Sequence, residues 1–151
     1  MREAARLYKI VHADSEFKKP NKTYVDQCTG ATRRRFIPDS GASADLVGQQ
    51  GLDEEEQKSA TRATDTLNIS TANGLAVSND EVDLDVPKLG IWIKPHILED
   101  CPDVLSMGIR CAEQGFGFYW DPFSYRPKSI RPDGRTIRCT YEKGGYRWCL
   151  L

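Results

Sequence analysis

The sequence predicts a mostly β protein with one short helix toward its C-terminal end. Twelve glycines and eight prolines occur in 151 residues, and most of them separate apolar runs of strand length. Apolar and acidic residues alternate along Val82–Val86, which is typical of a half-buried strand. The length suits one compact domain rather than two.

The N-terminal region is expected to divide after residue 30. Residues 1–30 are polar apart from an apolar cluster at Leu7–Val11, and they are expected to form an extension, partly disordered or paired as an outer strand. Residues 31–151 are expected to form the domain. Its first strand should end at Ile37, because Pro38 holds the preceding residue extended and lacks an amide donor.

Two strands joined by a tight turn are predicted within Thr66–Val86. Asn73 and Gly74 favour that turn because both residues tolerate positive φ. Leu89–Leu98 is predicted to be the next strand, with a bulge or break at Pro95.

The predicted helix follows a short apolar strand within Asp103–Trp120. It spans about Met107–Gln114, Gly115 caps it, and the aromatic run after it begins another strand. The segment from Arg135 to the C-terminus has the pattern of a strand, a Gly-Gly turn and a strand.

Charge and cysteine content argue against several classes of protein. The net charge of −1 gives no electrostatic reason to bind nucleic acid or an anionic membrane. Five cysteines without a C-x-x-C pair predict reduced thiols rather than a disulfide framework or a zinc ribbon. No apolar run approaches a membrane span, and the N-terminal segment lacks the apolar core of a signal peptide. A cytoplasmic protein is therefore expected.

Asp39, in the stretch FIPDSGASADLV (36–47), is the main candidate for chemistry. Two carboxylates held close together share one proton, so that one acts as base and the other as acid, and such a pair can activate water for amide hydrolysis. Each carboxylate must then lie on a tight loop of small residues. Ser40 can brace such a loop, Gly41 allows a close backbone approach, and Ala42 leaves space beside the carboxylate.

The tetrad Asp-Ser-Gly-Ala resembles the D-[ST]-G-[AS] signature of aspartic proteases. Because the chain contains one such motif, it is similar to the retropepsins, in which two identical chains each give one aspartate. The tetrad Thr71, Ala72, Asn73 and Gly74 resembles the flap in the proteases of Copia-type retrotransposons. Residues 102–120 resemble the wall beside their catalytic loop and the helix that follows. The resemblance covers about Phe36–Trp120.

This resemblance implies a small, closed, mostly β barrel that is active as a homodimer. It implies an aspartic endopeptidase for a retroelement polyprotein, in which one Asp39 from each protomer activates water. Residues Thr71–Gly74 would close over an extended peptide, and the side-chain pockets would be lined by Ile37, Val104 and Leu105.

The partners that the resemblance implies are a polypeptide substrate and a second copy of the chain, in the cytoplasm or within a virus-like particle. No cofactor is needed for this chemistry. No metal site is expected, because His12 and His96 have no Cys or Asp partner at ligand spacing.

Three features depart from the family pattern. Pro38 stands where a bulky apolar residue is usual, which is expected to be tolerated but could shift the loop. The acidic insert Asp53–Glu56 could alter the charge preference for substrate. No zinc knuckle precedes the domain, as in a segment excised from a larger polyprotein.

Other interpretations stay open at this point. An isolated Asp-Ser-Gly is more often a β-turn or a helix N-cap than a catalytic group. The main alternative is a non-catalytic module of the same fold that binds peptide or dimerises. A third is a β barrel that binds nucleic acid through Arg33–Arg35. That run is more typical of a solvated strand edge, and the aromatic run Phe116–Trp120 lacks the basic companions of a base-stacking platform. Nucleic acid is therefore not an expected partner.

Overall fold

The computed structural model describes residues 24–25, 32–71 and 74–139, and the structural statements below concern these residues. Their strands are β1 (Tyr24–Val25), β2 (Thr32–Arg33), β3 (Ile37–Asp39), β4 (Leu46–Gly48), β5 (Thr61–Thr71), β6 (Gly74–Glu81), β7 (Leu84–Val86), β8 (Ile91–Ile93), β9 (His96–Leu98), β10 (Val104–Ser106), β11 (Gly117–Tyr119), β12 (Lys128–Ile130) and β13 (Thr136–Arg138). The helical segments are the 3-10 turn η2 (Gln49–Gly51), the α-helix α2 (Glu54–Ser59) and the π-helix η3 (Ile109–Glu113).

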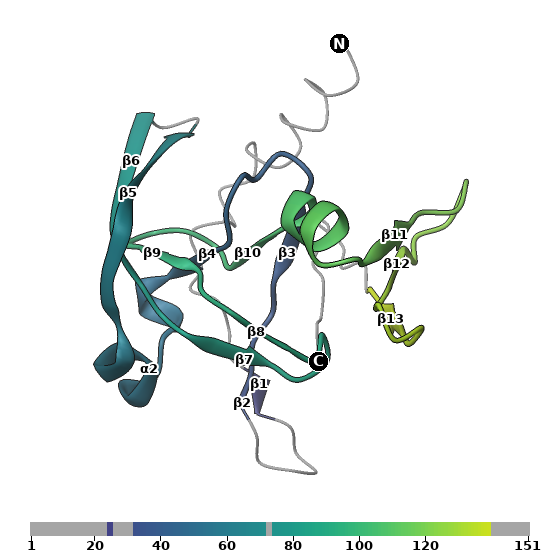
Figure 1. Cartoon of the computed structure of the whole chain (residues 1–151), viewed down its shortest axis with the longest axis horizontal. Helices are drawn as coiled ribbons and strands as arrows, with labels where there is room; N and C mark the ends of the chain where they lie inside the picture. Colours follow the sequence, from purple (N-terminus) through teal and green to yellow (C-terminus); the bar gives the residue numbers. More distant parts are fainter. Residues whose placement is uncertain (1–23, 26–31, 72–73, 140–151) are drawn as a thin grey trace.

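A six-stranded sheet with the order β3-β10-β4-β9-β6-β5 forms the centre of the molecule (Figure 1). Strand β10 runs parallel to β3 and antiparallel to β4. It therefore pairs with both strands that flank the loop 40–45, although it follows them by more than fifty residues. Strand β4 also pairs with β9 in parallel, which continues the sheet toward β6.

The predicted hairpin is confirmed as β5 and β6, which form a long antiparallel pair. It begins earlier than expected, at Thr61, and it ends at Glu81 rather than at Val86. Its last described pair is Thr71 with Gly74, so Gly74 lies in the ladder. Gly74 has a φ of 118°, a conformation that glycine adopts at little cost. Ala72 and Asn73 lie outside the described residues.

Strands β7 and β8 pair with each other as a separate two-stranded sheet. The alternation predicted for Val82–Val86 is confirmed, since its three apolar residues are buried while Asp83 and Asp85 are exposed. The predicted break at Pro95 is also confirmed, because it separates β8 from β9. The proline cannot donate to a ladder, but its carbonyl accepts a hydrogen bond from the Val82 amide at 3.2 Å.

The C-terminal part consists of η3 and a three-stranded sheet with the order β11-β12-β13. The helix lies within the predicted range, although it is π-helical, and Gly115 follows it with a φ of 73°. Strand β12 was not expected from the sequence. Phe116 and Ile137 belong to the same buried cluster as Phe36 and Val47, so this sheet shares the core of the central sheet.

Two expectations about the architecture are corrected. The described strands form four separate sheets rather than a closed barrel, and β3 and β5 are the open edges of the largest sheet. One reason is Pro95. It lacks an amide donor and lies between β8 and β9, so these two strands do not form one continuous strand. The second correction is that η3 is not the single helix, because α2 is a regular helix with a capping box formed by Asp53 and Glu56.

The boundary region near residue 30 contains a short pairing. Strand β1 lies within the expected extension and pairs with β2. For Tyr24 and Val25, this pairing agrees with the expectation that part of the extension forms an outer strand. The rest of residues 1–30, like the Gly-Gly turn and the strand expected after it, lies outside the described residues.

Candidate functional site: the Asp39 loop

Asp39 is the last residue of β3 and its side chain is exposed. One carboxylate oxygen, Oδ1, accepts a hydrogen bond from the backbone N–H of Gly41 at 2.7 Å. This is the local turn that an Asp followed by two small residues favours. A Cβ placed on Gly41 would lie 3.3 Å from the same oxygen, so a larger residue would press on the carboxylate.

Pro38 fits β3 because β3 is an edge strand. The Ile37 amide donates to the carbonyl of Asp103 at 2.8 Å, so the next amide position along the strand faces away from β10. The missing N–H of Pro38 therefore lies on the edge of the sheet that faces away from β10, so no ladder bond to a described strand is lost. Pro38 pairs in register with Leu105.

Ser106 lies opposite Asp39 in the parallel ladder and fixes the loop that follows it. Its hydroxyl donates to the carbonyl of Ala42 at 2.6 Å and accepts from the amide of Ile109 at 3.3 Å. One buried side chain thus connects the Asp39 loop to the start of η3.

Asp45 closes the loop from its other end and is buried. Its Oδ1 accepts from the amide of Ser106 at 2.8 Å, and its Oδ2 forms an ion pair with Arg110 of η3. The Asp45 carbonyl also accepts from the amide of His96 at 2.9 Å. A buried charge needs such compensation, and each partner here supplies it for the other.

Sequence reasoning did not single out Asp45 or Arg110. Their side chains meet across 65 positions of sequence, so no local spacing indicates the pair. The one available signal is that each is a charged residue directly beside an apolar segment. Ser106 lies within residues 102–120, which resemble the wall beside the catalytic loop, but the resemblance gave it no role of its own.

A second buried carboxylate supports the far end of β4. Asp103 accepts from the amide of Gly48 at 3.0 Å and from Arg34 at 3.1 Å. Arg34 also donates to the carbonyl of Gly51 at 3.0 Å and pairs with Glu56. For Arg34 the expectation of a solvated strand edge was therefore wrong. Glu56 of the acidic insert has a structural partner, whereas Glu54 and Glu55 are exposed.

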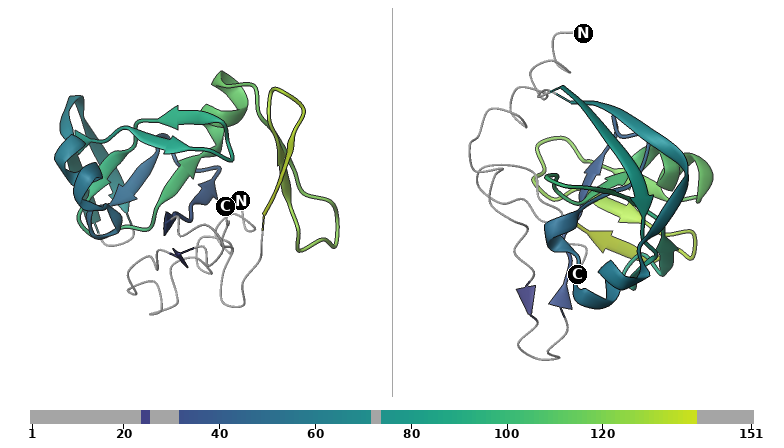
Figure 2. Two further views of the ribbon diagram at one scale, coloured as in Figure 1. Left: turned by 90° about the horizontal axis from the view of Figure 1, so that it is seen from below. Right: turned by 90° about the vertical axis from the view of Figure 1, so that its left-hand side faces the viewer.

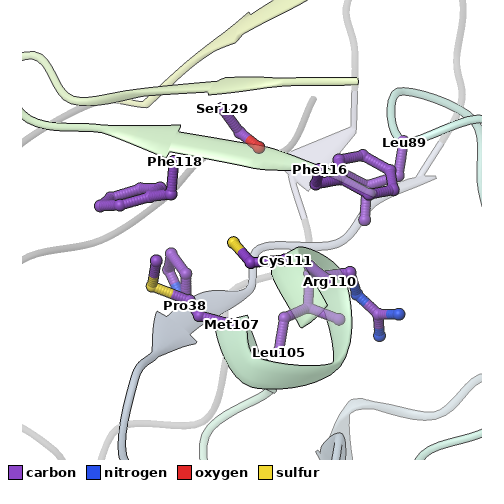
Figure 3. A pocket seen from close by; sticks show the side chains of 9 residues that line it. All are labelled: Pro38, Leu89, Leu105, Met107, Arg110, Cys111, Phe116, Phe118 and Ser129. Atoms are coloured by element: carbon purple, nitrogen blue, oxygen red, sulfur yellow. The ribbon is translucent and has the colours of Figure 1, made fainter. Parts of the chain in front are cut away.

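A small apolar pocket lies between β10, η3 and β11 (Figure 3). Pro38 and Leu105 are among the residues that line it. The pocket therefore adjoins Pro38, the residue that precedes Asp39. Of the other residues expected to line pockets, Val104 is buried and Ile37 is half-buried, and neither lines this cavity. The complete lining is Pro38, Leu89, Leu105, Met107, Arg110, Cys111, Phe116, Phe118 and Ser129.

The hairpin and the Asp39 loop lie at the same end of the molecule. In Figure 1 the loop after β3 and the end of the β5–β6 pair at which Thr71 and Gly74 meet both lie toward the top of the view. Of the four residues expected to act as a flap, Thr71 and Gly74 are the last pair of the ladder, and the other two lie outside the described residues.

No family model matches the sequence, and no curated protein matches it.

Within the part of the chain that the structure describes, no three His, Cys, Asp or Glu side chains are grouped so that they could hold a metal ion. Within the same residues, no helix has the length and apolar character that crossing a bilayer requires.

Proposed function

We propose that the chain is an aspartic endopeptidase of the retropepsin type, active as a homodimer. The observation that carries the proposal is the placement of Asp39. It stands exposed at the end of an open edge strand, in a turn of small residues that Ser106 and Asp45 hold from the buried side. Two buried polar side chains thus fix the position of the turn that carries this carboxylate.

In this proposal each protomer gives one Asp39 to a site on the two-fold axis. One carboxylate takes a proton from a bound water, and the other, protonated, donates to the carbonyl oxygen of the scissile peptide bond. The Gly41 amide, which already bonds to Oδ1, holds each carboxylate in a fixed orientation. Small side chains at Ala42 and Ser43 leave room for the partner loop.

The proposed substrate is an extended polypeptide, and a retroelement polyprotein in the cytoplasm or in a virus-like particle is the specific case. The β5–β6 hairpin could cover such a peptide and exclude water from it. Its exposed Leu75 and Val77 would provide apolar contacts near the turn. An extended chain would also gain backbone hydrogen bonds by pairing with strand residues.

The test is the cleavage of a peptide library and of a polyprotein at mildly acidic pH by the purified chain and by Asp39→Asn. The substitution keeps the size of the side chain and removes its acid–base function, so turnover should fall to background. Asp85→Asn, on the exposed face of β7, is the matched control and should keep full activity. Pepstatin should inhibit the unaltered chain.

Persistent cleavage in Asp39→Asn would overturn the proposal. A dimer that binds peptide but gives no cleavage in the unaltered chain would favour the alternative of a non-catalytic peptide-binding or dimerisation module.

A further inference from the structure

The charges of this chain are segregated, although their sum is close to zero. Residues 115–139 contain five Lys or Arg and two Asp, whereas residues 32–114 contain eight Lys or Arg and fifteen Asp or Glu. The C-terminal sheet is therefore cationic, whereas residues 32–114 are anionic. The net charge alone does not reveal it.

The outer face of the β11–β13 sheet combines an aromatic ring with two cations. The register places Tyr119 opposite Lys128, and Lys128 opposite Arg138, so the three side chains form one row across the sheet. The neighbouring row, Phe118, Ser129 and Ile137, faces the protein: two of these line the pocket and the third is in the core. Like charges directly opposite each other are unfavourable without a counter-charge.

The loop between β11 and β12 presents further aromatic rings. It projects away from the rest of the molecule in both Figure 1 and Figure 2. Trp120 is 45% exposed, Tyr125 is 68% exposed and Phe123 is fully exposed. Phe123 also has a φ of 60°, which is unfavourable for an aromatic residue. Because its side chain is fully exposed, Phe123 does not contribute to the hydrophobic core.

Hydrogen bonds hold the loop in shape. The Trp120 indole donates to the carbonyl of Ser124 at 2.7 Å, and the Ser124 amide donates to the carbonyl of Asp121 at 3.1 Å. The Arg126 amide donates to the Ser124 hydroxyl at 3.0 Å. The rings are thus presented by an ordered loop, which lowers the entropic cost of binding a ligand.

We propose that this aromatic and cationic surface binds single-stranded nucleic acid. Exposed rings beside a cationic track are the combination that stacks unpaired bases while it neutralises their phosphates. Arg126 and Arg138 have no ion-pair partner among the described residues, and Lys128 has one only at 3.9 Å, from Asp121. An acidic peptide would satisfy the cations but would not offer flat groups that stack on the exposed rings. A second copy of the chain would bring another cationic face if it docked on this same surface by two-fold symmetry.

The cations on this sheet are not all equivalent. Arg131 and Arg135 share Asp133, at 2.8 and 3.7 Å, so their charge is partly neutralised. The proposal therefore assigns phosphate contacts to Lys128, Arg126 and Arg138. It does not involve Arg34, whose side chain is occupied by Asp103 and Glu56.

The experiment measures the fluorescence anisotropy of a labelled oligouridylate of about 12 nucleotides as the full chain is added. Trp120→Ala and, separately, Phe123→Ala should weaken binding by about 5- to 150-fold, the range found when one stacking ring is removed. Trp92→Ala is the matched control, because Trp92 is 68% exposed but lies on β8. It should leave the affinity unchanged.

A salt titration tests the electrostatic part. Arg138→Glu should weaken binding and should lower the slope of log affinity against log salt by about 0.7 for the lost phosphate contact. Lys58→Glu, the same charge change on exposed α2, should alter neither quantity. Thermal unfolding of every variant verifies the fold.

Equal affinities for Trp120→Ala and Trp92→Ala would overturn the proposal. So would a failure of the unaltered chain to bind, or binding of polyglutamate as tight as that of the oligonucleotide. Loss of self-association in Trp120→Ala, without any change in oligonucleotide binding, would assign the surface to a second copy instead.

Discussion

Asp39 lies directly opposite Ser106 in the parallel ladder between β3 and β10. The first is an exposed carboxylate, and the second is a buried hydroxyl that holds the loop after it. Because β10 inserts between the two strands that flank this loop, a segment far along the chain determines where the carboxylate stands. The predictions below separate this positioning from general stability.

Removal of the Ser106 hydroxyl should affect stability and activity together. In Ser106→Ala the carbonyl of Ala42 loses its donor in a half-buried setting, which should cost about 1–3 kcal/mol of unfolding free energy. Urea unfolding measures this cost, and the proposed peptidase activity should fall because the Asp39 loop loses its support.

Ser78→Ala is the matched control for that change. Ser78 and Ser106 are each 1% exposed, and the Ser78 hydroxyl also donates to a carbonyl, that of Ile97 at 2.8 Å. Its removal should cost a similar free energy but should leave kcat unchanged in the folded protein. Equal losses of kcat in both variants would argue against a positioning role for Ser106.

The buried pair of Asp45 and Arg110 should be important for stability. Asp45→Ala leaves the guanidinium of Arg110 unpaired in the interior, and the amide of Ser106 loses its acceptor. We expect a loss of about 3–5 kcal/mol, measured by urea unfolding. As a control, Lys94→Ala removes the surface ion pair with Glu81 and should be close to neutral. If the two variants unfold alike, Asp45 does not anchor the loop.

Thiol chemistry provides a test that does not depend on the proposed function. Burial, followed by the charges of Asp103 and Asp100, raises the pKa of Cys101 to about 12. Burial raises the pKa of Cys139 to about 12. Because the thiolate is the reactive form, iodoacetamide at pH 8 should modify both slowly, whereas the exposed Cys111 should be accessible to it. Peptide mass mapping of a time course distinguishes the three, and rapid labelling of Cys139 would contradict the buried setting.

The same pKa shift predicts how stability depends on alkaline pH. Folding raises the pKa of Cys139 from 9.0 to about 12, so the folded state retains a proton that the unfolded state releases. The stabilisation is fully present below pH 9.0 and should be lost as the pH rises toward about 12. Melting temperatures should fall less steeply over that range in Cys139→Ala than in the unaltered chain. Parallel curves would contradict this assignment.

The sequence predicted features that depend on neighbouring residues. The hairpin near Gly74, the break at Pro95 and the glycine after the helix each follow from the backbone preferences of one residue, although Gly74 begins β6 rather than lying in the turn. Asp39 was found as a candidate because its motif is contiguous. These signals lie within a few positions of the residue that they concern.

Features that depend on distant pairing could not be predicted from one sequence. The Arg34 and Asp103 side chains meet across 69 positions, and the capping box of α2 brings Glu56 into the same cluster. The expectation of a solvated arginine run failed because it considered only the strand itself. The cationic sheet was missed for a related reason. The row that begins with Tyr119 is completed by Lys128 and Arg138, which come from two later strands.

The central claim is that two chains share one catalytic site, and a subunit-mixing experiment tests it most directly. Wild-type chain is mixed and re-equilibrated with a ninefold excess of Asp39→Asn, and peptide cleavage is measured per wild-type chain. If each site needs Asp39 from both protomers, random pairing leaves about one-tenth of the wild-type chains in active dimers, and activity falls to about that level. Activity per wild-type chain that stays the same or rises would show that one Asp39 is sufficient and would contradict the shared site.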